Sequence, residues 1–293
     1  MTSPADTPAA APTAAPAPSP IPGHDVPPDA PAMIEFDHVT KHFGPKCVLD
    51  DVSFQIRKGE TFIIVGRSGA GKSVTLQHMI RLLSPDSGRV LIEGRDIHAA
   101  DPAQLTEILR TFGVLFQSAA LLQWLTVLDN VALPLRQTTN LSEDEILRLS
   151  REKLALVSLP DAAAKYPANI SGGMKKRAGL ARAIVTNPAI VLYDEPTAGL
   201  DPVISRQIDL LIDRLRRTLR ITSVVVTHDL YSALRIGTRI AMLHEGKIII
   251  CATPEEFIAS PLPLVQDFLI AQGIHTLDDV ARAFAHIHED PVP

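Results

Sequence analysis

The chain has 293 residues, of which 46% are hydrophobic and 21% are charged, close to the composition of an ordinary globular protein. Its formal net charge is −5, from 28 Lys and Arg against 33 Asp and Glu. A nucleic-acid-binding protein usually carries a basic surplus, so we expect no nucleic-acid partner. Two distant cysteines, Cys47 and Cys251, argue against a disulfide framework and indicate a reducing compartment.

The first 31 residues are dominated by Pro and Ala, with scarcely any large apolar side chain. Such a segment cannot bury enough surface to offset its ordering entropy, so we expect a disordered tail over residues 1–31. It has neither the basic nor the apolar region of a secretory signal. Apolar runs further on, such as 62–65, are far shorter than the roughly 18–20 residues that cross a bilayer. The sequence predicts a cytosolic protein whose folded part begins near Met33.

The first half of the folded chain alternates short strands with helices. The pattern predicts strands at 34–39, 48–56 and 61–65, a helix at 73–83, a strand at 90–92, a helix at 102–111 and a strand at 113–116. Residues 118–182 then carry mostly helical signals, including Ser142 with Glu145 as a capping box before a helix at 143–157. We expect an inserted helical subdomain over this stretch.

The alternation resumes after residue 182. It predicts a strand at 189–193, a helix at 204–219, a strand at 222–226, a helix from Asp229 and paired strands at 239–243 and 247–252. Thr253 with Glu256 caps a further helix. Alternating strands and helices predict an α/β fold with a sheet core. A C-terminal helical extension over 261–293 is predicted by the helical spacing of Leu264, Val265, Phe268, Leu269, Ile274, Val280 and Phe284.

A phosphate-binding loop follows the strand at 61–65. Gly66-Arg67-Ser68-Gly69-Ala70-Gly71-Lys72-Ser73 matches the pattern G-x-x-x-x-G-K-[ST], and Val74 continues into a helix. In this pattern backbone N–H groups turn inward around phosphate oxygens at the positive end of the helix. Lys72 is expected to reach the β- and γ-phosphates of ATP, and Ser73 to offer its hydroxyl to Mg²⁺.

Two carboxylates end the apolar strand Ile190-Val191-Leu192-Tyr193-Asp194-Glu195. Such a strand carries them to the carboxyl edge of the sheet, where open α/β folds bind ligands. We expect Asp194 to hold Mg²⁺ and Glu195 to orient or deprotonate the attacking water. The pattern is weak alone, because many strands end in acidic residues, and becomes specific beside the glycine-rich loop.

The segment Ile170-Ser171-Gly172-Gly173-Met174 resembles the LSGGQ signature of the ABC (ATP-binding cassette) ATPase family. Residues 34 to about 258 match that family in order. The resemblance implies an ABC ATPase domain over 33–260, with a RecA-like parallel-sheet core, an N-terminal antiparallel β-subdomain and the helical subdomain at about 118–182. Further resemblances are Gln117 to the Q-loop, Asp201 in Ala198-Gly199-Leu200-Asp201 to the D-loop, His228 to the switch histidine and Phe43 to the aromatic that stacks on adenine.

The resemblance implies roles that the residues alone do not assign. In this family two cassettes pair head to tail, so that Ser171, Gly172 and Gly173 of one copy would contact the γ-phosphate of ATP held by the other. Gln117 would sense Mg²⁺ and the attacking water while contacting a membrane permease. His228 would hold the γ-phosphate and Asp201 would link the two sites. The implied partners are a second copy of the chain and a permease subunit.

The signature departs from the family pattern at two positions, with Ile170 in place of leucine and Met174 in place of glutamine. The Ser-Gly-Gly-Met variant, with Leu-Phe-Gln-Ser-Ala-Ala-Leu at 115–121, resembles the ATPases of Mla/Mce-type lipid-transport systems. That implies phospholipid transport between membranes with an Mce-like substrate-binding protein, from the cytoplasmic face of the inner membrane. Two alternatives stay open: an importer of an amino acid, osmolyte or ion, and a soluble ABC protein acting on ribosomes or DNA.

Three further features each allow two interpretations. Trp124 either packs within the helical subdomain or lines a groove for the permease. Lys175-Lys176-Arg177, directly after the signature, either forms a solvated first helical turn or lies near ATP or lipid headgroups. The C-terminal extension either packs back on the cassette or, as in lipid-transport relatives, clasps the partner ATPase.

Overall fold

The computed structural model describes residues 26–27, 29–276 and 279. The predicted tail up to residue 25, together with Val280 and Phe284, lies outside the described residues. Within the described part of the chain, no helix has both the length and the apolar character needed to cross a membrane.

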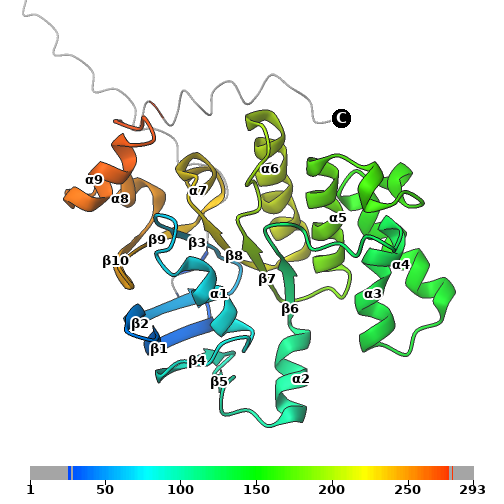
Figure 1. Ribbon diagram of the computed structural model, residues 1–293, viewed down its shortest axis with the longest axis horizontal. Helices are drawn as coiled ribbons and strands as arrows, with labels where there is room; N and C mark the ends of the chain where they lie inside the picture. The colour runs from blue at the N-terminus through cyan, green and yellow to red at the C-terminus, as the bar shows by residue number, and fades with distance from the viewer. Residues whose placement is uncertain (1–25, 28, 277–278, 280–293) are drawn as a thin grey trace, which may run out of the picture.

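A six-stranded sheet forms the centre of the fold (Figure 1). Its order is β10-β9-β3-β8-β7-β6, and all neighbours pair in parallel except β10, which runs antiparallel to β9. Every residue of β3 and β8 is buried, as is typical of a parallel sheet covered on both faces. The bounds are β3 Thr61–Val65, β6 Phe112–Leu115, β7 Ile190–Asp194, β8 Thr222–Thr227, β9 Arg239–His244 and β10 Lys247–Ala252.

A second, antiparallel sheet has the order β2-β1-β4-β5. Its strands are β1 Ala32–Phe43, β2 Lys46–Arg57, β4 Ser87–Ile92 and β5 Arg95–Asp96. Phe36 stacks on Phe54 with ring centroids 4.6 Å apart, and Phe54 stacks on Phe62 of β3 at 5.2 Å. Helix α1 (Lys72–Met79) buries Leu76 and Met79 in the same apolar cluster. The two sheets therefore share a core, with the glycine-rich loop between them in sequence.

Four helices follow α1 in sequence: α2 Pro102–Arg110, α3 Val127–Thr138, α4 Glu143–Leu156 and α5 Gly172–Ile184. Helices α3, α4 and α5 pack on one another and form a helical block at the right of Figure 1. The block joins the central sheet where α5 crosses β6. A Cβ on Gly113 of β6 would lie 2.0 Å from the carbonyl oxygen of Ala183, so the two backbones meet without a side chain between them.

The strand at 61–65 begins and ends where the sequence predicts, whereas two local predictions are wrong. The helix predicted to reach residue 83 ends at Met79, because Arg81 takes a left-handed conformation with φ 55°. Ser142 accepts a hydrogen bond from the backbone N–H of Glu145 as an N-cap, but the capping box is not completed. The Glu145 carboxylate lies instead 3.9 Å from Arg148, one turn further along α4.

The remaining helices are α6 Pro202–Leu219, α7 Leu230–Ile236, α8 Pro254–Ile258 and α9 Pro263–Ile270. Thr253 and Glu256 form both bonds of the predicted capping box before α8. Val265, Phe268 and Leu269 of α9, with Ile274 beyond it, are buried in the main core cluster. The described part of the C-terminal extension thus packs back on the rest of the chain, and the clasp on a partner ATPase stays a prediction.

Candidate functional site

The glycine-rich loop connects the buried strand β3 to the first turn of α1. Gly71 precedes the helix with φ 106°, and Gly66 leaves the strand with φ 157°. A Cβ on Gly66 would lie 2.3 Å from the carbonyl oxygen of Leu243, and one on Gly71 would lie 2.8 Å from that of Val48. Only glycine fits at both positions, which explains why the loop turns tightly between the two sheets.

A cleft of about 630 Å³ opens beside this loop, within the range of small-molecule sites. Its walls contain most of the predicted site residues, which come from strand β1, from the glycine-rich loop with the start of α1, and from the segments that follow β6, β7 and β8. Four lining residues were not predicted: Lys46, Val48, Phe268 and Gln272. The predicted residues that line it are Phe43, Arg67, Ser68, Gly69, Gly71, Lys72, Ser73, Val74, Gln117, Glu195 and His228.

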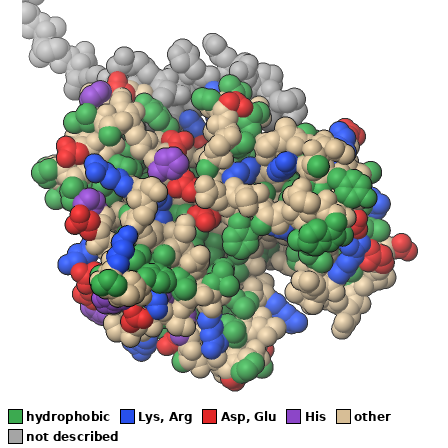
Figure 2. All heavy atoms as spheres, viewed as in Figure 1, with side chains coloured by type: hydrophobic (Ala, Val, Ile, Leu, Met, Phe, Trp, Pro, Cys, Tyr) green, Lys and Arg blue, Asp and Glu red, His purple; other side chains and the backbone are tan. Residues whose placement is uncertain are grey.

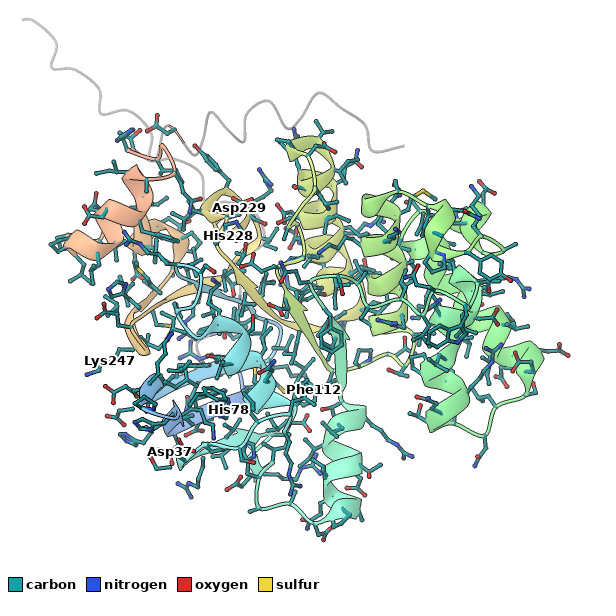
Figure 3. The ribbon with its side chains drawn as sticks, viewed as in Figure 1. Asp37, His78, Phe112, His228, Asp229 and Lys247 are labelled. Atoms are coloured by element: carbon teal, nitrogen blue, oxygen red, sulfur yellow. The ribbon has the colours of Figure 1, made fainter. Side chains whose placement is uncertain are left out.

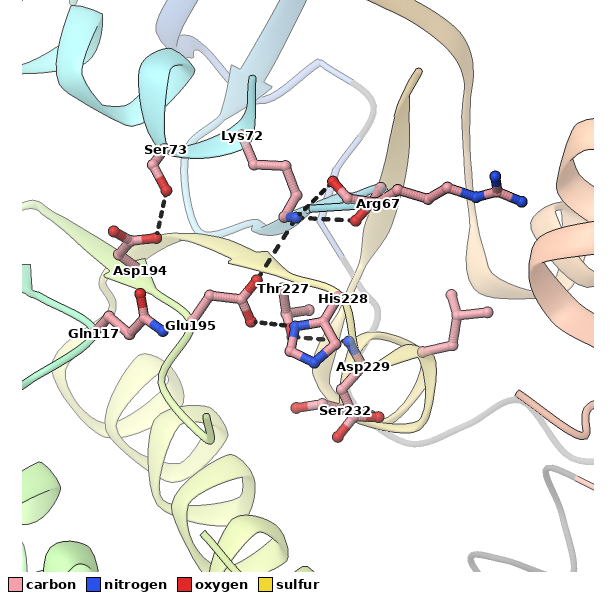
Figure 4. A network of polar contacts seen from close by, with 12 residues as sticks. Arg67, Lys72, Ser73, Gln117, Asp194, Glu195, Thr227, His228, Asp229 and Ser232 are labelled. Atoms are coloured by element: carbon pink, nitrogen blue, oxygen red, sulfur yellow. Dashed lines mark hydrogen bonds and ion pairs between the residues drawn. The ribbon is translucent and has the colours of Figure 1, made fainter. Parts of the chain in front are cut away.

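At the floor of the cleft, Glu195 lies between two nitrogen-bearing side chains (Figure 4). The Lys72 Nζ is 3.6 Å from Glu195 Oε1 and donates hydrogen bonds to the backbone carbonyls of Gly66 and Arg67 at 2.9 and 3.3 Å. The His228 Nδ1 lies 2.9 Å from Glu195 Oε2. Lys72 and Glu195 are largely buried whereas His228 is exposed. A buried ammonium group therefore contacts one carboxylate oxygen of Glu195, and a solvent-exposed imidazole contacts the other.

The backbone at Glu195 is also fixed. Its φ of 46° is left-handed, unusual for a residue with a side chain, and its N–H donates to the carbonyl of Val226 on β8 at 2.9 Å. His228 follows the end of β8, and Asp229 comes next at the start of α7 (Figure 3). Asp229 caps α7 by accepting a hydrogen bond from the backbone N–H of Ser232. Adjacent parallel strands β7 and β8 thus bring the glutamate and the histidine to the same sheet edge.

Ser73 and Asp194 form a second polar pair beside the first. The Ser73 hydroxyl donates to Asp194 Oδ1 at 3.0 Å, and burial raises the pKa of the Asp194 carboxyl while the Ser73 bond opposes that shift. Gln117 and Asp194 share the wall of an adjoining cleft. Hydroxyl, carboxylate and amide oxygens are ligands that Mg²⁺ accepts, so these residues fit the predicted ion. Among the described residues no three His, Cys, Asp or Glu side chains gather to hold a metal alone.

The signature segment lies outside the cleft beside the glycine-rich loop. Ser171 is exposed and caps α5, accepting from the backbone N–H of Met174 at 3.3 Å. A Cβ on Gly173 would lie 2.6 Å from Ile204 Cγ2, so the first turn of α5 packs against the first turn of α6. Asp201 caps α6 by accepting from two backbone N–H groups at 3.0 Å. Ser171, Gly172 and Asp201 are therefore exposed at these two helix starts, with Gly173 buried between the helices.

Lys176 is one of the three basic residues for which two interpretations stayed open. It is buried, with 5% exposure, so the prediction of a solvated first helical turn is wrong for this residue. Its Nζ donates to the carbonyl of Gln117 at 2.6 Å and to that of Glu195 at 3.0 Å. Burial lowers the pKa of its ammonium group. Lys176 lies one turn after Gly173 and three residues before Gly179, both also buried, and this helical spacing is the signal in the sequence that places it on the inner face of α5.

Trp124 does not pack within the helical subdomain, and its place in a permease groove stays a prediction. It is 73% exposed, so it does not pack into the helical block. A groove of about 730 Å³ does open between α2, β6 and α3, and Figure 2 shows the surface hollowed there, but Trp124 is not among its lining residues. The groove is lined instead by side chains such as Leu109, Phe112, Phe116 and Leu133.

Comparison with known families identifies the chain. A family model described as "ABC transporter" matches residues 49–198, across the glycine-rich loop, the signature and the Asp194-Glu195 strand. The chain belongs to the ABC transporter family. It is an ATP-binding subunit of that family and an ATPase, with the α/β fold that the sequence predicts.

Three curated relatives bear different names. The chain is 42% identical over 241 residues to the probable ribonucleotide transport ATP-binding protein mkl of Mycobacterium tuberculosis H37Rv, covering 82% of this chain and 67% of mkl. It is 36% identical over 260 residues to the intermembrane phospholipid transport system ATP-binding protein MlaF of Haemophilus influenzae, covering 89% and 97%. It is 40% identical over 217 residues to the methionine import ATP-binding protein MetN of Rhizobium johnstonii, covering 74% and 60%.

Solved structures of the bacterial ABC transporter cassette MJ0796 share the fold. Its dimeric structure has a TM-score of 0.71 at 35% identity, covering 76% of this chain and 99% of that cassette. A dimeric post-hydrolysis state of the same cassette, bound to ADP and Pi, has a TM-score of 0.70 at 34% identity with the same coverage.

Proposed function

We propose that this ABC transporter subunit powers phospholipid transport between membranes, with Glu195 as the residue that activates water for ATP hydrolysis. The observation that carries the hydrolytic part is the position of the Glu195 carboxylate between Lys72 and His228 in the nucleotide cleft. A general base must lie within hydrogen-bond reach of the water that it deprotonates, and a fixed, partly desolvated carboxylate at the cleft floor meets that need.

Lys72 and His228 would both contact the phosphates of ATP. Lys72 projects from the first turn of α1, where the positive helix end and the loop N–H groups favour an anion, and it would hold the β- and γ-phosphates. His228 is exposed on the solvent side of Glu195 and would contact the γ-phosphate while orienting the glutamate. Phe43, 46% exposed at the outer end of the cleft, offers its ring for stacking on adenine.

Ser73, Asp194 and Gln117 would hold Mg²⁺ together with phosphate oxygens. When bound, the ion would neutralise charge that develops on the phosphates. Ser73 and Asp194 are already within 3.0 Å of each other, and Gln117 reaches the same edge from the end of β6.

A complete ATP site would need a second copy of the chain. Ser171, Gly172 and Gly173 lie outside the cleft, and Ser171 and Gly172 are exposed at the start of α5, so this helix start is available to cap ATP held by a partner. Asp201 lies at the adjoining start of α6, where it would link the two sites. The MJ0796 cassette, which shares the fold, was solved as a dimer.

The groove between α2, β6 and α3 suits a membrane permease. It is concave and mostly apolar, and Phe116 in its wall precedes Gln117 of the nucleotide site. A permease segment in this groove would therefore lie one residue from a proposed Mg²⁺ ligand. This arrangement supports a peripheral position on the cytoplasmic face of the inner membrane, with the chain held there through its permease.

The cargo proposal rests on MlaF, which the chain matches over 97% of that protein's length, and on the Ser-Gly-Gly-Met signature. An Mce-like substrate-binding protein would then be a further partner. The names of mkl and MetN favour a different solute as the second candidate. A ribosome- or DNA-acting ABC protein is a poorer fit, because the chain has an acidic balance and an apolar groove.

Two experiments test the proposal. Chains with Lys72→Ala and with Ser171→Arg should each be inactive, while their mixture should recover about a quarter of the parental hydrolysis, since half the dimers are mixed and each has one intact composite site. A mixture as inactive as its components would overturn the head-to-tail dimer.

The second experiment tests the cargo. The chain purified from membranes should be accompanied by a permease, an Mce-like subunit and phospholipid, whereas a soluble solute-binding subunit in their place would establish the second candidate.

A further inference from the structure

The C-terminal helix α9 reaches the nucleotide cleft, although it lies beyond the residues that the family model matches. Phe268 and Gln272 both contribute to the cleft wall, on the side of His228. The contact joins segments about forty residues apart in sequence. It suggests a role for the extension besides covering the core.

The Gln272 side chain binds the loop that carries His228 at two points. Its Nε2 donates to the backbone carbonyl of His228 at 2.7 Å, and its Oε1 accepts from the backbone N–H of Leu230 at 2.8 Å. One side-chain amide thus bonds both a carbonyl and an N–H of the segment that leads into α7, as the backbone of a neighbouring β-strand would. Both distances are in the normal range for such bonds.

The His228 imidazole itself has few restraints. It is 65% exposed, and the polar contact that the structure gives its ring is Glu195 Oε2. The direction of the ring therefore depends on the backbone of residues 227–230. That backbone is held from within by Asp229 N–H to Thr227 Oγ1 at 3.0 Å, and from outside by Gln272.

Gln272 is itself held firmly. Its backbone N–H donates to the carbonyl of Leu269, and Gly273 then turns the chain with φ 73°. Ile274 follows at 1% exposure and donates to the same Leu269 carbonyl. This turn between two buried residues fixes the backbone at Gln272, and the two bonds of the amide place its side chain, so it can act as a brace.

We propose that Gln272 is a positioning residue for hydrolysis, which sets His228 against Glu195 and makes the C-terminal helix α9 a control element of the ATPase. Any partner or chain movement that lifts α9 from the cassette removes the brace and slows turnover, while Lys72, Glu195 and His228 stay in the chain's cleft. The inference rests on the proposed role of His228 and is independent of cargo and permease.

The test compares Gln272, in the turn after α9, with Gln266 inside that helix, in the full-length chain purified with the membrane subunits that accompany it. Gln272→Ala should lower kcat about tenfold through loss of two hydrogen bonds, while KM for ATP changes less than about twofold. Gln266→Ala is the matched control: its amide donates to the carbonyl of Ser260 at 2.6 Å and does not reach the cleft, so turnover should stay at the parental level. Equal losses in both variants would refute the brace.

Gln272→Glu keeps the size of the side chain and the acceptor for Leu230, and it replaces the donor to His228 by a carboxylate. It should be as slow as Gln272→Ala at an unchanged melting temperature, which separates positioning from folding. In a His228→Ala background, Gln272→Ala should cause no further loss, because the brace would act through the histidine. If His228→Ala hydrolyses ATP at the parental rate, the proposed role of His228 fails; if it is slow and Gln272→Ala is not, the brace alone is wrong.

Discussion

Lys72 and Glu195 form an ion pair across the floor of the nucleotide cleft, with Nζ 3.6 Å from Oε1. Each partner is also held by the fold, Lys72 by two loop carbonyls and Glu195 by its bond to β8. The residue proposed to grip phosphate and the residue proposed to activate water are therefore adjacent in space, although 123 residues separate them in the chain. ATP and the Glu195 carboxylate would compete for the same ammonium group.

Glu195→Gln keeps the shape of that side chain and removes its charge and basicity. We expect hydrolysis to fall by about 10²–10⁴-fold, the usual contribution of a general base, while ATP binding persists and a closed dimer accumulates. The measurement is steady-state phosphate release together with size-exclusion chromatography in ATP. Glu143→Gln makes the same change in an exposed pair with Arg136 and should leave turnover unaltered. Parental turnover by the Glu195 variant would mean that another group activates the water.

Lys176→Met should weaken both the fold and catalysis. Methionine fills the space but leaves the carbonyls of Gln117 and Glu195 without their buried donor, at a cost of about 1–3 kcal/mol. Because both carbonyls belong to residues of the site, kcat should fall more than ATP affinity. Urea unfolding and hydrolysis kinetics measure the two effects. Lys175→Met, at the neighbouring half-buried position, should change neither by much; equal effects of the two substitutions would rule out a special role for Lys176.

Leu109→Glu tests the groove between α2, β6 and α3. A charge on its wall should weaken permease association about tenfold or more, because it must be desolvated on docking, while hydrolysis by the chain alone should be unchanged. Leu264→Glu on α9 is the control, since the two leucines are exposed to similar extents, 36% and 39%. The measurement is the fraction of each variant retained on membranes that contain the permease. Undiminished retention of Leu109→Glu would place the docking site elsewhere.

Asp209 should make stability fall with rising pH. Its carboxyl on α6 is buried, accepts a hydrogen bond from Ser232 and pairs with Arg235 of α7 at 2.7 Å; burial raises its pKa from 3.8 to about 6. The folded state therefore binds the proton more tightly than the unfolded state. The resulting stabilisation is fully present below about pH 3.8 and lost as pH rises through about 6, a change of roughly 3 kcal/mol.

Asp209→Asn keeps the shape and cannot ionise, so its free energy of unfolding should decline less than that of the parent between pH 4 and pH 7. Chemical denaturation at several pH values in this interval measures the difference. Asp213→Asn, one turn further along the same helix and half-buried beside Arg216, provides the comparison. Parallel pH profiles for the parent and Asp209→Asn would show that Asp209 ionises normally in the folded protein.

The parts of the site that follow from local chemistry were predictable from the sequence. The loop at 66–73 requires glycines at defined positions, and a buried strand before Asp194 fixes the sheet edge at which it ends. Phe43 and His228 needed the family resemblance, since a lone aromatic or histidine has no local signature. All of these lie at the cleft or beside it.

What the sequence does not reveal are contacts between side chains and distant backbone. Gln272 binds a loop 42–44 residues away, and Lys176 reaches a carbonyl 59 residues away. Backbone groups are identical along the chain, so no residue pattern marks which carbonyl a lysine or glutamine will meet. Helical spacing places Lys176 on the inner face of α5, but only the packed fold assigns its partners.

Gly113 carries a mechanical consequence. The backbone of β6 touches that of α5 at the carbonyl of Ala183, with no room for even one carbon atom between them. The helical block cannot move closer to the sheet at that point, and buried apolar contacts oppose its moving away. If the block turned relative to the sheet, this spot would act as a fulcrum: the Ala183 end would stay nearly still, while the Ser171 end, twelve residues away along α5, would sweep the larger arc. A small twist at the fulcrum would thereby be magnified at the end of α5 that a second copy of the chain would meet.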